Sequence, residues 1–152
     1  MCGGANFSVK NISQKELEKF YTSAQAQQIK QAGIFESFFW EKQPVLPISM
    51  PAGTQLRLWG NKSQGNNLPL TGWARIESLQ SGKWDRWQPE PVDLPLERGY
   101  EKKAWFKFKR GAKGILVKNE QDERVYIITQ NASAEYRQAT GHDREPVGDK
   151  AY

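Results

Sequence analysis

Apolar residues in this 152-residue chain occur in runs of only a few, and that limits what the chain can fold into. A helix that crosses a bilayer needs about 20 consecutive apolar residues, so membrane-spanning helices are excluded. The short runs after residue 54 are rich in β-branched and aromatic residues, which predicts strands at 55–59, 104–109, 114–117 and 125–129. A polar turn at 119–123 joins the last two strands into a hairpin.

Helices are indicated mainly near the start of the chain. Ser13 and Glu16 have the spacing of a capping box, and Ile12 is placed to contact Leu17 across the helix start. An apolar stripe follows at i, i+3, i+4 and i+7, made of Leu17, Phe20, Tyr21 and Ala24. A second helix is expected over 24–32, ending at Gly33, and helical spacing recurs at 73–79.

The remaining segments favour irregular or extended backbone. Pro44, Pro47 and Pro51 exclude a long helix between residues 35 and 51. The polar residues after Pro146 indicate a loose tail. We therefore predict one domain, residues 1–152, of the α+β class: a mainly antiparallel curved β-sheet or open barrel with a few helices.

The amino-acid composition limits the kinds of ligand and partner that we expect for this chain. One cysteine and one histidine exclude an internal disulfide and multi-cysteine zinc sites, so we expect no metal and no cofactor. The net charge of +5 suits a polyanionic partner, and six tryptophans can either fill a core or stack on unpaired bases. The start of the chain lacks a signal-peptide pattern, so we expect a cytoplasmic protein. We also expect a monomer that does not associate with membranes.

Cys2 is the residue with the most distinctive chemistry. Removal of Met1 leaves an α-amine and a thiol on adjacent carbons, with reference pKa values of about 7.7–8.0 and 8.5. The amine can form a Schiff base with an aldehyde, and the thiol can then close a thiazolidine ring on the same carbon. An internal cysteine cannot do this, because its nitrogen is an amide. The alternative is that Cys2 has no chemical role.

Six short segments occur in a particular order along the chain. They are Met1-Cys2-Gly3, Leu58-Trp59-Gly60, the run from Trp73 to Leu79, Gly99-Tyr100-Glu101, Ile127-Ile128-Thr129, and His142-Asp143-Arg144-Glu145-Pro146-Val147. Together they resemble the motifs of the SOS response-associated peptidase (SRAP) family over nearly the whole chain. The resemblance implies an SRAP-like fold and a protein that recognises abasic sites in single-stranded DNA.

The resemblance also implies a reaction and its residues. Family members crosslink the abasic-site aldehyde through the N-terminal cysteine, and they remove the residue before that cysteine by autoproteolysis. Cys2 would be the nucleophile, Glu101 the catalytic glutamate and His142 the catalytic histidine. A carboxyl group and an imidazole can shuttle the protons that ring opening and loss of water require. Without the resemblance, Glu101 and His142 read as ordinary surface residues.

DNA contacts are expected from cationic and aromatic side chains. Arg75 would hold a backbone phosphate, with Glu77 as its ion-pair partner, and Trp59, Trp73 and Tyr100 would stack on bases. The alternating Lys107 and Lys109, followed by Arg110 and Lys113, would extend the cationic track. The alternatives are core packing for each tryptophan and a solvated strand face for the lysines.

The chain departs from the family pattern at several positions. Trp73 stands where the family has Asn, with Asn66 and Asn67 as the nearest replacements; Gly4 stands where Arg is common, and Glu145 where Met is usual. The chain ends at Tyr152, soon after the last motif, so we expect a short, divergent member of bacterial or phage origin, associated with the nucleoid when bound to DNA. Two other functions remain open: a non-covalent single-stranded DNA-binding module, and an N-terminal-cysteine peptidase acting on peptides.

Overall fold

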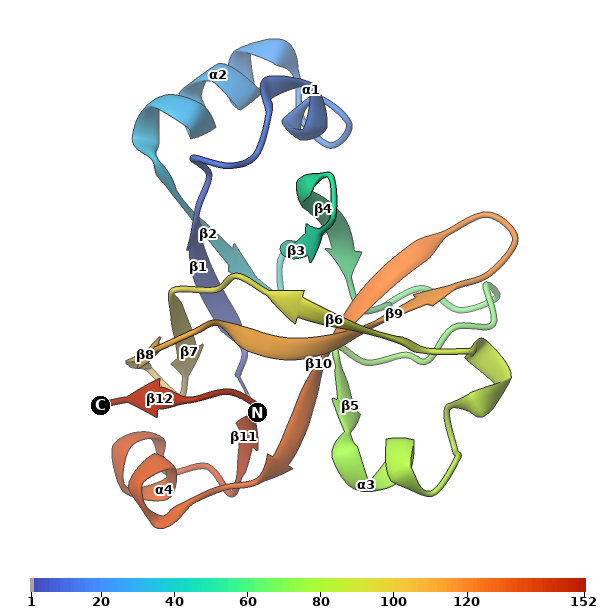
Figure 1. Cartoon of the computed structure of the whole chain (residues 1–152), viewed down its shortest axis with the longest axis vertical. Helices are drawn as coiled ribbons and strands as arrows, with labels where there is room; N and C mark the ends of the chain where they lie inside the picture. Colours follow the sequence, from blue (N-terminus) through green and yellow to red (C-terminus); the bar gives the residue numbers. More distant parts are fainter. Residues whose placement is uncertain (1) are drawn as a thin grey trace.

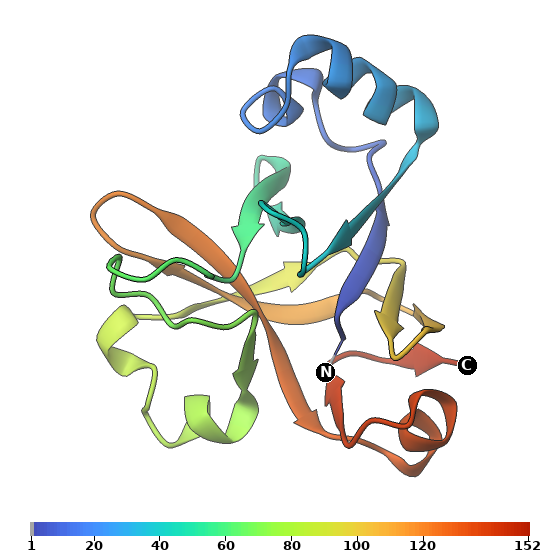
Figure 2. The same ribbon diagram turned by 180° about the vertical axis from the view of Figure 1, so that it is seen from behind.

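The computed structural model describes residues 2–152, which form four short helices and two β-sheets (Figure 1). The helical elements are α1 (Gln14–Leu17), α2 (Ser23–Ala32), α3 (Ile76–Gln80), α4 (Ala134–Thr140) and the 3-10 turn η1 (Asp85–Trp87). Figures 1 and 2 show α1 and α2 as a lobe at one end of the molecule and α4 toward the other. The predicted α+β class is confirmed.

The first sheet is open and entirely antiparallel, with strand order β12-β8-β7-β1-β2. Its strands are β1 (Gly4–Ser8), β2 (Ile34–Phe38), β7 (Arg98–Glu101), β8 (Ala104–Phe108) and β12 (Lys150–Ala151). Because β1 lies between β7 and β2, the residues that lead into it are held by both neighbours. This sheet therefore positions the start of the chain.

The second sheet closes into a five-stranded barrel, β10-β4-β3-β6-β9, because β9 also pairs with β10. Its strands are β3 (Val45–Met50), β4 (Gly53–Trp59), β6 (Glu90–Leu94), β9 (Ala112–Lys118) and β10 (Glu123–Asn131), with β5 (Trp73–Arg75) and β11 (Arg144–Pro146) added along β10. Closure depends on the nine-residue β10, which pairs with β9 and is parallel to β4 and β5. The sequence predicted a curved sheet or an open barrel; the barrel is closed.

The hairpin β9–β10 and the extended segment around Pro44 to Pro51 agree with the prediction. Three predicted elements differ from the structure. Residues 73–75 form a strand, because they pair with Ile127–Thr129, and the helix begins only at Ile76. The first helix ends at Leu17, since Thr22 and Gln25 form a second capping box that starts α2. The tail is not loose: Lys150 and Ala151 pair with β8.

A buried hydrogen bond attaches the first turn of α1 to the barrel. Ser13 caps the backbone N–H of Glu16, as expected. The Glu16 carboxylate, however, accepts from the N–H of Leu56 in β4 at 2.9 Å instead of completing the capping box. A helix that is too short to be stable alone is thereby attached to the barrel. The main buried cluster extends from Cys2 to Tyr136 along the chain.

Candidate functional site

Hydrogen bonds hold the segment after Cys2 on both sides. The N–H of Gly3 donates to the Tyr100 carbonyl at 2.7 Å, and the Gly3 carbonyl accepts from the N–H of Phe39 at 3.0 Å. The Cys2 thiol donates to the Gly4 carbonyl at 2.8 Å. Cys2 itself has no exposed surface. Its backbone and side chain are thus held in one place at the end of β1.

Burial controls the acidity of the Cys2 thiol. It raises the pKa of this thiol to about 12, and the negative charge of Glu101 adds to the effect. Hydrogen bonds with the backbone of Tyr100 and Gly4 oppose the shift without cancelling it. The sulfur is therefore a protonated thiol at neutral pH.

Glu101 is the last residue of β7 and is nearly buried. Two residues earlier, Gly99 makes room for the cysteine: a Cβ at Gly99 would lie 2.9 Å from Sγ of Cys2 and 2.4 Å from the Phe106 ring. A side chain at position 99 would displace both groups. The strand that carries Glu101 therefore also forms the wall beside the sulfur.

His142 follows α4, which ends at Gly141 in the left-handed conformation. Its Nδ1 accepts from the N–H of Arg144 at 3.0 Å, so the neutral imidazole carries its proton on Nε2. Nζ of Lys102, the residue after Glu101, donates to the Gly141 carbonyl at 3.2 Å. This bond links the turn after Glu101 to the end of α4, just before His142, although the two segments are far apart in the sequence.

Trp73 is half-buried, and its indole makes a contact that the sequence did not suggest. Its Nε1 donates to the Cys2 carbonyl at 2.8 Å. The ring packs against Phe39 and Trp59, with centroids at 4.8 and 6.0 Å. The indole N–H thus supplies a hydrogen-bond donor to the backbone of Cys2.

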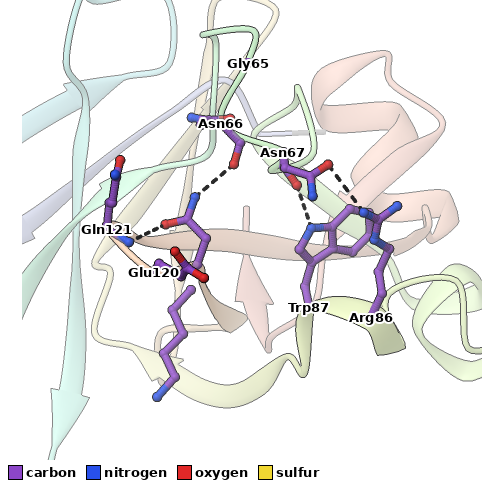
Figure 3. Close-up of a pocket in the computed structure, with 9 residues that line it drawn as sticks. Gly65, Asn66, Asn67, Arg86, Trp87, Glu120 and Gln121 are labelled. Atoms are coloured by element: carbon purple, nitrogen blue, oxygen red, sulfur yellow. Dashed lines mark hydrogen bonds between the residues drawn. The ribbon is translucent and has the colours of Figure 1, made fainter.

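Asn66 and Asn67 do not replace that amide, because they line a separate cavity of about 440 Å³ (Figure 3). Asn66 bonds with the side chain of Asn61, and Oδ1 of Asn67 accepts from Arg86. The Trp87 indole donates to the Asn67 carbonyl at 2.7 Å. Both asparagine side chains are therefore hydrogen-bonded to residues around this cavity.

The structure corrects one expected DNA contact, Trp59, and one expected ion pair, Arg75 with Glu77. Trp59 is 1% exposed and its Nε1 donates to the Gly72 carbonyl, so this ring is part of the core and cannot stack on a base. Glu77 pairs with Arg144 rather than with Arg75, through two bonds of 2.8 and 2.9 Å. The hydrogen bond from Arg144 holds the pKa of Glu77 at about 2.

The other candidate DNA-contacting side chains are at least partly exposed, so single-stranded DNA can reach them. Arg75 ends β5 and is exposed, and Lys107 and Lys109 are exposed on and just after β8. Tyr100 is half-buried on the outer face of the first sheet. Their role as DNA contacts stays a prediction.

Sequence reasoning did not single out three aromatic residues near these groups. Trp40 and Trp105 are exposed beside Tyr100, and Tyr136 is buried near Cys2 and Glu101, whose charges, after burial itself, raise the Tyr136 pKa well above its usual range. The alternation of residues from Trp105 to Lys109 was the available signal for Trp105, and no pattern in the sequence indicated Trp40. Nothing in the sequence indicated the contact of Tyr136.

Comparison with known proteins identifies no family model, curated protein or solved structure that matches the chain. Within residues 2–152, no group of three or more His, Cys, Asp or Glu side chains is placed to hold a metal ion. In the same range, no helix is long and apolar enough to cross a membrane.

Proposed function

We propose that this protein traps abasic sites in single-stranded DNA by forming a thiazolidine through Cys2 after Met1 is removed. The observation that carries the proposal is the fixed placement of Cys2 against β7, the strand that ends at Glu101: Gly3 bonds to the Tyr100 carbonyl, and the Cys2 sulfur lies against Gly99. A five-membered ring can form only if the amine and the sulfur reach the same carbon, which favours a fixed backbone at residue 2.

The protonated thiol sets the order of bond formation. The α-amine of Cys2 adds to the aldehyde carbon of the opened sugar, and the carbinolamine loses one water to give an imine. The sulfur then adds to the imine carbon. The thiol proton leaves through Glu101 and the imine nitrogen ends with one proton, so the net reaction joins the two molecules and releases one water. Nε2–H of His142 is the donor for the departing oxygen.

Removal of Met1 is part of the proposal. The same sulfur would attack the carbonyl carbon of the preceding peptide bond, displacing the Cys2 nitrogen to give a thioester that water hydrolyses. This step frees the amine on which the crosslink depends. The Glu101 carboxylate, whose charge acts on the thiol, is the group that would take up the thiol proton.

One observation favours a second candidate, a single-stranded DNA-binding module without covalent chemistry. Cys2 has no exposed surface, and burial raises the pKa of its thiol to about 12. Both properties slow a thiol reaction with a macromolecular substrate. The experiment must therefore separate binding from bond formation.

Intact mass spectrometry makes this separation. The purified protein is weighed to establish whether Met1 is present, then mixed with a single-stranded oligonucleotide that contains one abasic site. We expect a species that survives heating in detergent, with a mass equal to the sum of the two molecules less one water. A tetrahydrofuran abasic analogue, which has no aldehyde, and the Cys2→Ala variant should give none. A Met1-free protein that binds the oligonucleotide at neutral pH without forming this species would establish the non-covalent module instead.

A further inference from the structure

Four aromatic rings form a continuous cluster on the outer face of the first sheet. The cluster, which we call the aromatic platform, consists of Phe38, Trp40, Tyr100 and Trp105. Phe38 stacks on Trp40 at a centroid distance of 4.5 Å, and Tyr100 lies 5.0 Å from Trp105 and 5.6 Å from Phe38. Trp40 is 65% exposed and Trp105 is 38% exposed, although large apolar side chains are usually covered.

The strand register explains why the rings share one face. Gly4 of β1 lies between Phe38 of β2 and Tyr100 of β7, and Tyr100 is opposite Trp105 of β8. A Cβ at Gly4 would lie only 2.3 Å from the Phe38 ring. The ring therefore fills the position from which the arginine common in the SRAP family would project. This chain has an aromatic surface where members of that family commonly have an arginine.

Cations lie in the next row of the same face. Arg98 lies two residues from Tyr100 on β7, and Lys107 lies two residues from Trp105 on β8. Arg98 and Lys107 are opposite each other, and both are exposed. Lys102 and Lys103, in the turn between β7 and β8, are exposed at the other side of the platform. Glu36 is an acidic residue in the cationic row, and it lies on the edge strand β2. The platform is thus bordered by positive charge at both ends.

We propose that the aromatic platform binds unpaired bases of single-stranded DNA next to the lesion, by stacking. Exposed rings within a cationic border are the combination by which proteins bind single strands without sequence preference, since every base has a π-face and every nucleotide a phosphate. The identity of the strand as lesion-bearing DNA rests on the proposed function. The platform is adjacent to the reactive end, because the Tyr100 carbonyl bonds to the residue after Cys2 and a Cβ at Gly3 would lie 3.8 Å from the Trp40 ring.

The test uses the full-length protein and a fluorescein-labelled oligo-dT without an abasic site. The Trp40→Ala/Trp105→Ala variant should bind about ten-fold more weakly for each base that loses its ring, with an unchanged salt dependence. Lys107→Gln should instead lower the slope of log affinity against log salt by about 0.7. The matched control is Ile34→Ala, which removes an exposed apolar side chain from β2.

Each outcome decides the question separately from the covalent chemistry. Equal oligo-dT affinity in the wild-type protein and the double tryptophan variant, with circular dichroism showing the variant folded, overturns the platform, whether or not an abasic oligonucleotide is crosslinked. The platform is also overturned if the wild-type protein fails to bind oligo-dT at low salt. Loss of binding in the double variant, with no crosslink in the wild type, supports the platform and contradicts the proposed reaction.

Discussion

The indole of Trp73 and the backbone of Cys2 form the contact that bears most directly on the reactive group. The hydrogen bond from Nε1 spans 2.8 Å and links residues 71 positions apart. Only the tertiary structure shows it, because tryptophan in this position suggests stacking or core packing. At the scale of single residues, Trp73 thus places a hydrogen-bond donor on the backbone of Cys2.

Trp73→Phe should keep the ring packing and remove this donor. We expect the free energy of unfolding to fall by about 1 kcal/mol, the usual net value of one hydrogen bond. The single-turnover crosslinking rate should fall roughly 10–100-fold, because a displaced nucleophile loses its alignment. Affinity for an oligonucleotide without an abasic site should stay unchanged.

Trp59→Phe is the matched control, since it removes the hydrogen bond from a buried indole to the Gly72 carbonyl. It should lower stability by a similar amount and leave the crosslinking rate nearly intact. Equal loss of rate in both variants would show that Trp73 contributes only to folding.

The acidity of the Cys2 thiol gives a second prediction. Because the folded-state pKa of about 12 lies far above the ordinary value of a thiol, thiolate is scarce at pH 8 in the native protein. Alkylation by iodoacetamide at pH 8 should be at least about a hundred-fold slower than in urea. Burial of the protonated Cys2 thiol also contributes to the free energy of unfolding. Because the pKa is raised in the folded state, this contribution is complete below about pH 9 and is lost as the pH rises toward about 12. Rapid native alkylation would contradict the burial of Cys2.

At the scale of elements, the last strand depends on a buried ion pair. Nζ of Lys150 lies 3.1 Å from Oε2 of Glu145, and both side chains are less than a tenth exposed. Glu145 also accepts from the N–H of Ser133, the residue that caps α4. Glu145 therefore joins β11, β12 and α4.

Glu145→Met should leave the Lys150 charge buried without its partner and lower the free energy of unfolding by about 3–5 kcal/mol. The double variant Glu145→Met/Lys150→Met should recover much of this loss, because neither charge is then buried. Urea denaturation of the single and double variants measures the coupling. Additive losses in the double variant would contradict a paired role for these two residues.

At the scale of the whole molecule, a closed barrel and an open sheet hold positive charge on several separate elements. The net charge is +5. Arg75 is exposed at the end of β5, where the barrel's added strand leads into α3. Lys113, by contrast, pairs with Asp93 at 2.5 Å. Replacing either residue by a neutral one lowers the net charge by the same amount. A difference in DNA binding between the two variants therefore reports the position of the charge and not the total charge.

Arg75→Ala should weaken binding of single-stranded DNA regardless of base sequence and reduce the log–log salt slope by about 0.7, the value for one phosphate contact. Lys113→Gln removes the same charge from an ion pair and should leave the slope close to that of the wild type. Fluorescence anisotropy over a range of salt concentrations measures both. Identical slopes for wild type and Arg75→Ala would place the phosphate elsewhere.

The local pattern of residues was sufficient for the fold class, the hairpin β9–β10 and the end of α2. These features depend on neighbours in sequence: alternation, caps and turn residues. The choice of Cys2 as the reactive candidate depends on the covalent chemistry of an N-terminal cysteine and stays a prediction. The same local information placed residues 73–75 in a helix, because apolar spacing does not report that a segment pairs with β10.

Long-range pairing decided the rest. Closure of the barrel, burial of Trp59, the contact of Trp73 with Cys2, the partner of Glu77 and the order of the last strand all join residues distant in sequence. The free energy of such contacts depends on which surfaces meet and exclude water, and this is a property of the assembled chain. The sequence by itself determined the fold class, because alternation and caps act between near neighbours; only the tertiary structure decided which side chains surround residue 2.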